Sequence, residues 1–111
     1  MYTRTQGPGR CIFVIEEGDP IVLTNLGGTV VVGPHLAAAG GQMVIEYDGS
    51  YLQDFCWGVL NPDGTLGFQS EPLGWLSQGM NVKLDLDQPG PPVDHLTHDD
   101  RRWFKWVTTF R

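Results

Sequence analysis

The tetrapeptide Asn61-Pro62-Asp63-Gly64 constrains the fold of this chain more than any other stretch. It stands between two short apolar runs, at positions 55–60 and 65–68. Proline presets the backbone angle of the first turn position, and Asp-Gly tolerates the bridge and left-handed angles that follow. Two apolar runs joined by such a turn form a β-hairpin. The sequence therefore predicts a hairpin centred on this turn.

Further apolar runs of strand length recur along the chain, separated by glycine or proline. They cover 11–15, 21–26, 29–32, 43–47, 81–87 and 102–111. The 111 residues include 15 glycines and 8 prolines, which indicates many tight turns. A chain of this length accommodates one hydrophobic core. We therefore expect an all-β fold with a single domain over 1–111, an antiparallel β-sandwich or small barrel of about seven or eight short strands.

Local patterns refine this expectation at the two ends of the domain. Residues 1–10 are predicted to form an N-terminal arm, and residues 88–100 a proline-rich and polar loop before the final strand. The alternation in 81–87 predicts a half-buried strand with one apolar face. Its inward residues would be Val82, Leu84 and Leu86, and its outward residues Lys83 and Asp85.

The middle of the chain gives four further expectations. Gly33-Pro34 should end the strand before it, and 35–39 has the composition for one helical turn before Gly40-Gly41 stops it. Gly27-Gly28 fits a two-residue hairpin loop, and Asp48-Gly49 fits another hairpin turn.

The charge distribution bears on the partner. The net charge is −6, and a phosphate backbone needs a basic footprint, so nucleic acid is not expected as a partner. No lysine or arginine occurs from Cys11 to Val82, whereas basic residues gather near the end of the chain: Arg101, Arg102, Lys105 and Arg111. A basic tail of this kind can dock on the acidic body of another copy. It can equally lie beside the acidic strands of its own chain, and the sequence leaves both open.

The sequence also bears on where the protein is made and on the redox state of its two cysteines. The first ten residues lack the apolar segment of a secretory signal, and no apolar run approaches the ~20 residues that span a membrane. We therefore expect cytoplasmic synthesis, compatible with a place in an assembled particle, and no membrane partner. Cys11 and Cys56 each lie in an apolar run, which favours buried free thiols, although a single disulfide stays open.

One segment concentrates metal-type ligands, with candidates His95, His98 and Asp99. Imidazole and carboxylate groups can hold zinc or another divalent ion. The segment lacks an HExxH pattern and a cysteine partner, so a polar surface loop is the better interpretation, and no metal site or cofactor is assigned. No nucleophile elbow or phosphate-binding loop occurs, so no catalytic residue is assigned and a non-enzymatic protein is favoured.

The aromatic residues are the remaining lead. Exposed aromatic side chains mark protein interfaces or sugar-stacking platforms. Trp57 and Trp106 are expected as core residues, and the expected platform consists of Trp103, Trp75 and Tyr51.

Three functional hypotheses result. The first is a non-enzymatic structural protein that binds itself or a larger protein shell, by analogy of size and class with small viral decoration or tail proteins. The second is a glycan- or peptide-binding β-sandwich that uses the exposed aromatics. The third is a small metal-dependent enzyme that uses His95 and His98.

Overall fold

The computed structural model describes residues 2–7, 10–86 and 105–111. In these residues the chain forms ten short strands and no helix, so the predicted all-β class is confirmed. Seven or eight strands were expected, and the described residues hold more because strands also form at Thr3–Gly7 and Gly74–Leu76, where none was predicted. None of these residues forms a helix long and apolar enough to cross a membrane. The strands are β1 (Thr3–Gly7), β2 (Arg10–Ile15), β3 (Pro20–Thr24), β4 (Val30–Leu36), β5 (Gln42–Glu46), β6 (Leu52–Leu60), β7 (Leu66–Gln69), β8 (Gly74–Leu76), β9 (Asn81–Asp85) and β10 (Lys105–Phe110).

The largest sheet is built on the predicted central hairpin. It has the strand order β4-β3-β6-β7, with β8 also pairing with β6. In the turn between β6 and β7, the Asn61 amide donates to the Thr65 carbonyl over 2.7 Å, and the Gly64 amide donates to the Asn61 carbonyl over 2.9 Å. Gly64 has a φ of 86°, the left-handed angle for which glycine is suited. The predicted hairpin is therefore confirmed.

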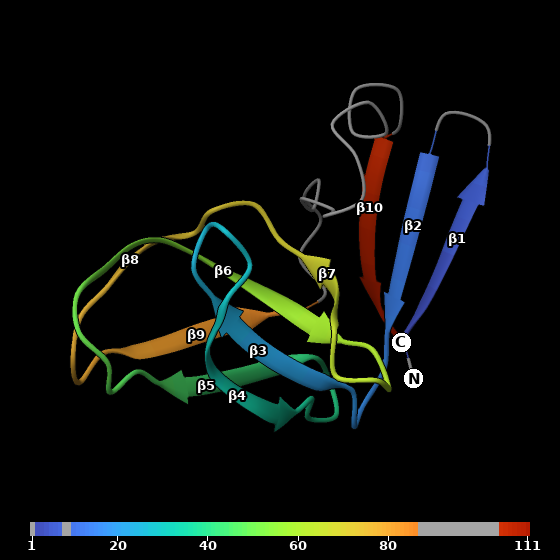
Figure 1. The fold of residues 1–111 in the computed structure, drawn as a ribbon. Helices are drawn as coiled ribbons and strands as arrows, with labels where there is room; N and C mark the ends of the chain where they lie inside the picture. Colours follow the sequence, from blue (N-terminus) through green and yellow to red (C-terminus); the bar gives the residue numbers. More distant parts are fainter. Residues whose placement is uncertain (1, 8–9, 87–104) are drawn as a thin grey trace.

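A three-stranded sheet, β1-β2-β10, rises from one end of the molecule (Figure 1). Thr3 pairs with Val14 on one side of β2, and Phe110 pairs with Ile15 on the other side. Part of the predicted N-terminal arm is therefore an ordered strand. The pairing of β10 with β2 is parallel, unlike the antiparallel pairs elsewhere. A parallel pair requires a long connection, and about 90 residues separate these two strands in sequence.

The remaining sheet pairs β5 with β9 and tests the predicted strand register. Val82, Leu84 and Leu86 are buried, whereas Lys83 and Asp85 are exposed, as the alternation predicts. The Asp48-Gly49 turn, however, does not form the expected hairpin. It leads from β5 into β6, and these two strands belong to different sheets. Both strands find partners far along the chain, which the local turn signal could not indicate.

Two other local expectations are wrong. Gly33-Pro34 lies inside β4 rather than at its end, and 35–39 forms no helical turn. The backbone of Ala37 instead bonds across to the turn before β3: its amide donates to the Asp19 carbonyl, and its carbonyl accepts from Gly18, both over 2.8 Å. These sheet-like hydrogen bonds replace those that a helical turn would make. The hairpin between β3 and β4 is confirmed, although its connection runs from Asn25 to Thr29 and is longer than two residues.

Side chains from the three sheets meet in one hydrophobic cluster. Phe68 is a buried member of this cluster, and its ring centroid lies 4.8 Å from that of Phe13 and 4.9 Å from that of Trp57. Trp57 is buried, as expected of a core tryptophan, whereas the side chain of Trp106 lies outside what the structure describes.

Candidate functional site

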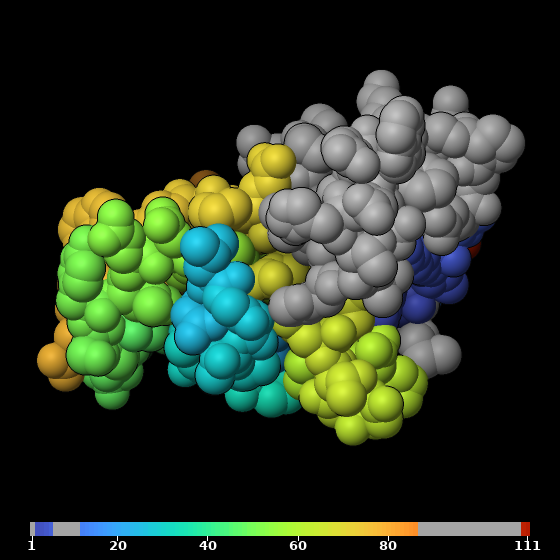
Figure 2. All heavy atoms as spheres, turned by 45° about the horizontal axis from the view of Figure 1, so that its top comes forward, coloured from blue at the N-terminus to red at the C-terminus, as the bar shows by residue number. Residues whose placement is uncertain are grey.

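Two of the three predicted platform residues lie side by side on the surface. The Tyr51 and Trp75 rings have centroids 6.1 Å apart and planes inclined by 28°. Tyr51 is 65% exposed and Trp75 is 54% exposed. In Figure 2 the segments around residues 50 (green) and 75 (gold) adjoin at the end of the molecule away from β1. We call Tyr51 and Trp75 the aromatic pair.

Strand pairing explains why the aromatic pair forms. Leu52 pairs with Leu76, and Phe55 pairs with Gly74, across β6 and β8. Leu76 and Phe55 point into the core, so the adjacent Trp75 faces outward, where Tyr51 meets it. Successive strand residues point to opposite faces, so Trp75 faces outward because its neighbour Leu76 is buried.

The turn before Tyr51 is held by hydrogen bonds. The Tyr47 hydroxyl donates to the Ser50 carbonyl over 2.6 Å, and the Tyr47 carbonyl accepts from the Gly79 amide over 2.8 Å. Nearby, the Gln78 side chain donates to Asp48 over 3.3 Å. The backbone beside the aromatic pair is therefore held by hydrogen bonds, and polar side chains lie close to the pair in sequence.

The other predicted interface residues are placed only in part. Arg111 is exposed, and its amide donates to the Ile15 carbonyl over 2.7 Å, which fixes the end of β10 beside β2. Lys105 is the first residue of β10, but its side chain is not described. Trp103, Arg101 and Arg102 lie outside the described residues.

The metal candidates His95, His98 and Asp99 also lie outside the described residues, so the metal hypothesis stays a prediction. Across 2–7, 10–86 and 105–111, no three histidine, cysteine or acidic side chains group as a metal site would require.

A second surface was not anticipated from the sequence. We call Val30, Val31 and Leu36 on β4 the β4 surface, because all three are exposed, Leu36 to 70%. Among the described strands β4 pairs with β3 alone, so its other edge is unpaired. A run of three valines shows no alternation that could reveal exposure. The only signal was Pro34, because proline within a strand is typical of a sheet edge.

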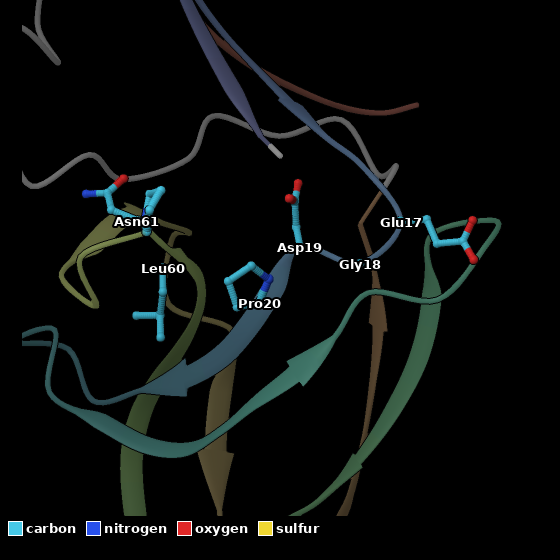
Figure 3. Close-up of a pocket in the computed structure, with 7 residues that line it drawn as sticks. Glu17, Gly18, Asp19, Pro20, Leu60 and Asn61 are labelled. Carbon is cyan, nitrogen blue, oxygen red and sulfur yellow. The ribbon is translucent and has the colours of Figure 1, made fainter.

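A shallow pocket of about 330 Å³ lies between the turn before β3 and the end of β6, lined by Glu17, Gly18, Asp19, Pro20, Leu60, Asn61 and Pro62. Its two carboxylates diverge, since the Glu17 side chain points away from Asp19 (Figure 3). The Asp19 carboxylate accepts a hydrogen bond from the Glu16 amide over 2.8 Å, which is a turn-stabilising contact. No nucleophile with an adjacent base occurs among the residues that line this pocket.

Cys56 is a free thiol buried in β6. Burial raises the pKa of this thiol, and the charge of Asp54 adds to the effect, while hydrogen bonds from Gln69 and Thr24 oppose it. A buried thiol with a raised pKa is a poor nucleophile, so Cys56 has the properties of a core residue.

Comparison of the chain with models of known protein families, with curated proteins and with solved structures finds no match.

Proposed function

We propose that this chain is a non-enzymatic assembly protein that associates with further copies of itself through the β4 surface. The observation that carries the proposal is an apolar strand edge that faces solvent. An unpaired edge offers backbone N–H and C=O groups to a second strand, and soluble proteins normally guard such edges with charge. Here β4 contains no lysine, arginine, aspartate or glutamate.

A second copy is the proposed occupant of the β4 surface, and the charges restrict where it can bind. Two molecules of net charge −6 repel each other at most contact surfaces. Contact between two β4 strands buries valines and leucines rather than like charges. The same patch on both partners also satisfies a two-fold symmetric interface, the commonest in soluble homo-oligomers.

The edge is open over only part of its length. Pro34 has no amide hydrogen to donate, and the register with β3 shifts between Ile21 and Leu23 and again before Thr24. Both features discourage indefinite edge-to-edge growth. They favour a closed pair formed around Val30 and Val31 over an extended stack of sheets.

The test is the mass in solution by light scattering on a sizing column, for the parent chain, Val31→Lys and Leu36→Lys. The matched control is Val44→Lys, since Val44 is 64% exposed on β5, outside the β4 surface. All three variants change the net charge from −6 to −5, so general repulsion is equal among them. We expect the parent and the control to form a defined oligomer. Each β4 variant should weaken association more than about tenfold, because like charges facing each other across an interface cost several kcal/mol.

Salt separates this proposal from docking by the basic tail. Association through an apolar strand edge should persist in moderate salt. Salt at that concentration screens exposed charges that are more than about 8–10 Å apart, so association through the basic tail should weaken. A monomeric parent chain would overturn the proposal. An oligomer that dissociates in salt and ignores Val31→Lys would overturn it too, in favour of the tail.

A further inference from the structure

We infer that the aromatic pair, Tyr51 and Trp75, is a binding site for a neutral carbohydrate. This inference goes beyond self-association and does not depend on it, because the site lies on β8 and on the residue before β6 rather than on β4.

The shape of the pair suits a flat ligand. The 28° angle makes the two ring planes nearly parallel, and the 6.1 Å centroid distance exceeds the spacing of rings in direct face contact. The two rings are therefore neighbours with nearly parallel planes, and since each side chain is more than half exposed, the pair offers aromatic surface to a ligand. A sugar ring has an apolar face of C–H groups and a polar rim, so it can stack on such a surface while its hydroxyl groups stay solvated.

The absence of basic residues from the segments around the aromatic pair restricts which ligands the pair can bind. The segments that carry the pair lie within the stretch from Cys11 to Val82, which has no lysine or arginine. An anionic ligand would find no cation on these segments, and phosphate recognition normally relies on one. Quaternary ammonium groups are bound by aromatic rings that enclose them, which two nearly parallel rings do not do.

Two polar side chains lie close in sequence to the aromatic pair and are proposed to meet the hydroxyl groups of a stacked sugar. Asp48 lies three residues before Tyr51, and Gln78 lies three residues after Trp75. Their side chains hydrogen-bond each other over 3.3 Å and are exposed, so each retains further donor or acceptor capacity. The phenol hydroxyl of Tyr51 adds a group that both donates and accepts.

The pair is also organised before any ligand arrives. Leu76 and Phe55 anchor the strands below it, and the Tyr47 hydroxyl holds the Ser50 carbonyl in the turn that leads to Tyr51. A preformed platform avoids the ordering cost that a flexible one would meet on binding.

The experiment titrates the full chain with cellohexaose, chitohexaose, maltohexaose and laminarihexaose, up to about 10 mM, following tryptophan fluorescence and heat of binding. The concentration range covers dissociation constants of about 1 mM. Trp57 is buried and should contribute little to a change, whereas Trp75 is exposed. Because Trp103 and Trp106 also fluoresce, the change is assigned to Trp75 by its loss in Trp75→Ala. We expect at least one oligosaccharide to give a saturable change.

Variants show whether the rings carry the binding. Tyr51→Ala and Trp75→Ala should each weaken affinity by roughly two- to tenfold, the range expected for one aromatic contact, and the double variant should lose detectable binding. Tyr51→Phe keeps the ring and should retain most of the affinity. Val44→Ala removes an exposed apolar side chain elsewhere and should leave binding unchanged.

Three outcomes would overturn the inference. One is the absence of saturable binding with every oligosaccharide. Another is binding that survives in the double variant. The third is saturable binding of a proline-rich peptide in place of sugars with the same sensitivity to Tyr51→Ala, which would make the pair a peptide site. Since light scattering on the double variant is measured in parallel, a failure here is distinguishable from a failure of self-association through β4.

Discussion

Replacing Gln69 with methionine should measure how a buried amide holds the hairpin that presents β4. The Gln69 side chain is only 3% exposed and reaches from β7 to the connection after β3. Its amide nitrogen donates to the Thr24 hydroxyl and the Asn25 carbonyl, each over 3.1 Å, and to the Leu26 carbonyl over 3.3 Å. Methionine has a similar length and no branch, so Gln69→Met removes the donor and keeps most of the packing.

The expected loss of stability in Gln69→Met depends on which hydrogen-bond acceptors are left without a donor. The Asn25 carbonyl keeps two donors, the Thr24 hydroxyl over 2.9 Å and the Gly28 amide over 3.1 Å. The Leu26 carbonyl lies in an exposed residue, where water can replace the amide. The main loss is therefore at the fully buried Thr24, whose hydroxyl oxygen loses the Gln69 donor although the hydroxyl still donates to Asn25. One unsatisfied buried group costs about 1–3 kcal/mol, so we expect a loss of about 2 kcal/mol in the free energy of unfolding.

The assay is urea and thermal unfolding followed by circular dichroism. A loss of that size should lower Tm by about 8 °C in a domain of this length. The control is Gln78→Met, the same substitution at an exposed glutamine that makes one long hydrogen bond, and it should change stability by less than about 0.5 kcal/mol. If Gln69→Met is as stable as Gln78→Met, the amide does not hold the hairpin and the reasoning is refuted.

Three further predictions concern other positions. Gly58→Ala should destabilise the fold by about 1–3 kcal/mol in urea unfolding, because its new methyl group overlaps a β7 carbonyl oxygen, whereas Gly27→Ala meets only an ordinary contact of 3.5 Å. In a variant without the other cysteine, Cys56 should resist alkylation at about pH 8.5 in the native state and react quickly in urea, because burial raises its pKa; fast native labelling would contradict this. The Asp63 carboxyl has a lowered pKa because the Thr65 hydroxyl and amide donate to it, so its contribution to stability is present above the unfolded-state pKa and is lost as pH falls through the folded-state pKa. Thr65→Val should raise that pKa part of the way to its ordinary value in an NMR titration, and an unchanged value would exclude the hydroxyl as a cause.

The parts of the fold that could be predicted are those set by neighbours in sequence. The turn at Asn61–Gly64 is specified by four consecutive residues, and the strand at 81–85 by a period of two. The pairing of β5 with β9 and of β10 with β2 joins segments far apart in the chain. No local pattern encodes those partners, so the sequence indicated the strands and not the sheets.

The residues of the candidate site could likewise be predicted only where neighbours in sequence determine them. Tyr51 and Trp75 could be identified one by one as aromatic residues outside the predicted core, but their contact depends on the register of β6 with β8. The β4 surface had no signal in the sequence other than Pro34, which indicates a sheet edge and not which side chains are exposed. Whether Val31 faces the core or the solvent depends on which strands lie beside β4, and that is a property of the whole sheet.

The parallel pairing of β2 with β10 also sets an order of events in folding. Lys105 pairs with Arg10, a partner 95 positions earlier (105 − 10), whereas the strands of the β3–β4 and β6–β7 hairpins are joined by short connections. Contacts between residues far apart in sequence form slowly, because a long loop must close before any of them is gained. The hairpins can assemble early, while one edge of β2 stays open until β10 arrives. The slowest phase of refolding, and the last amides to gain protection from hydrogen exchange, should therefore belong to β2 and β10.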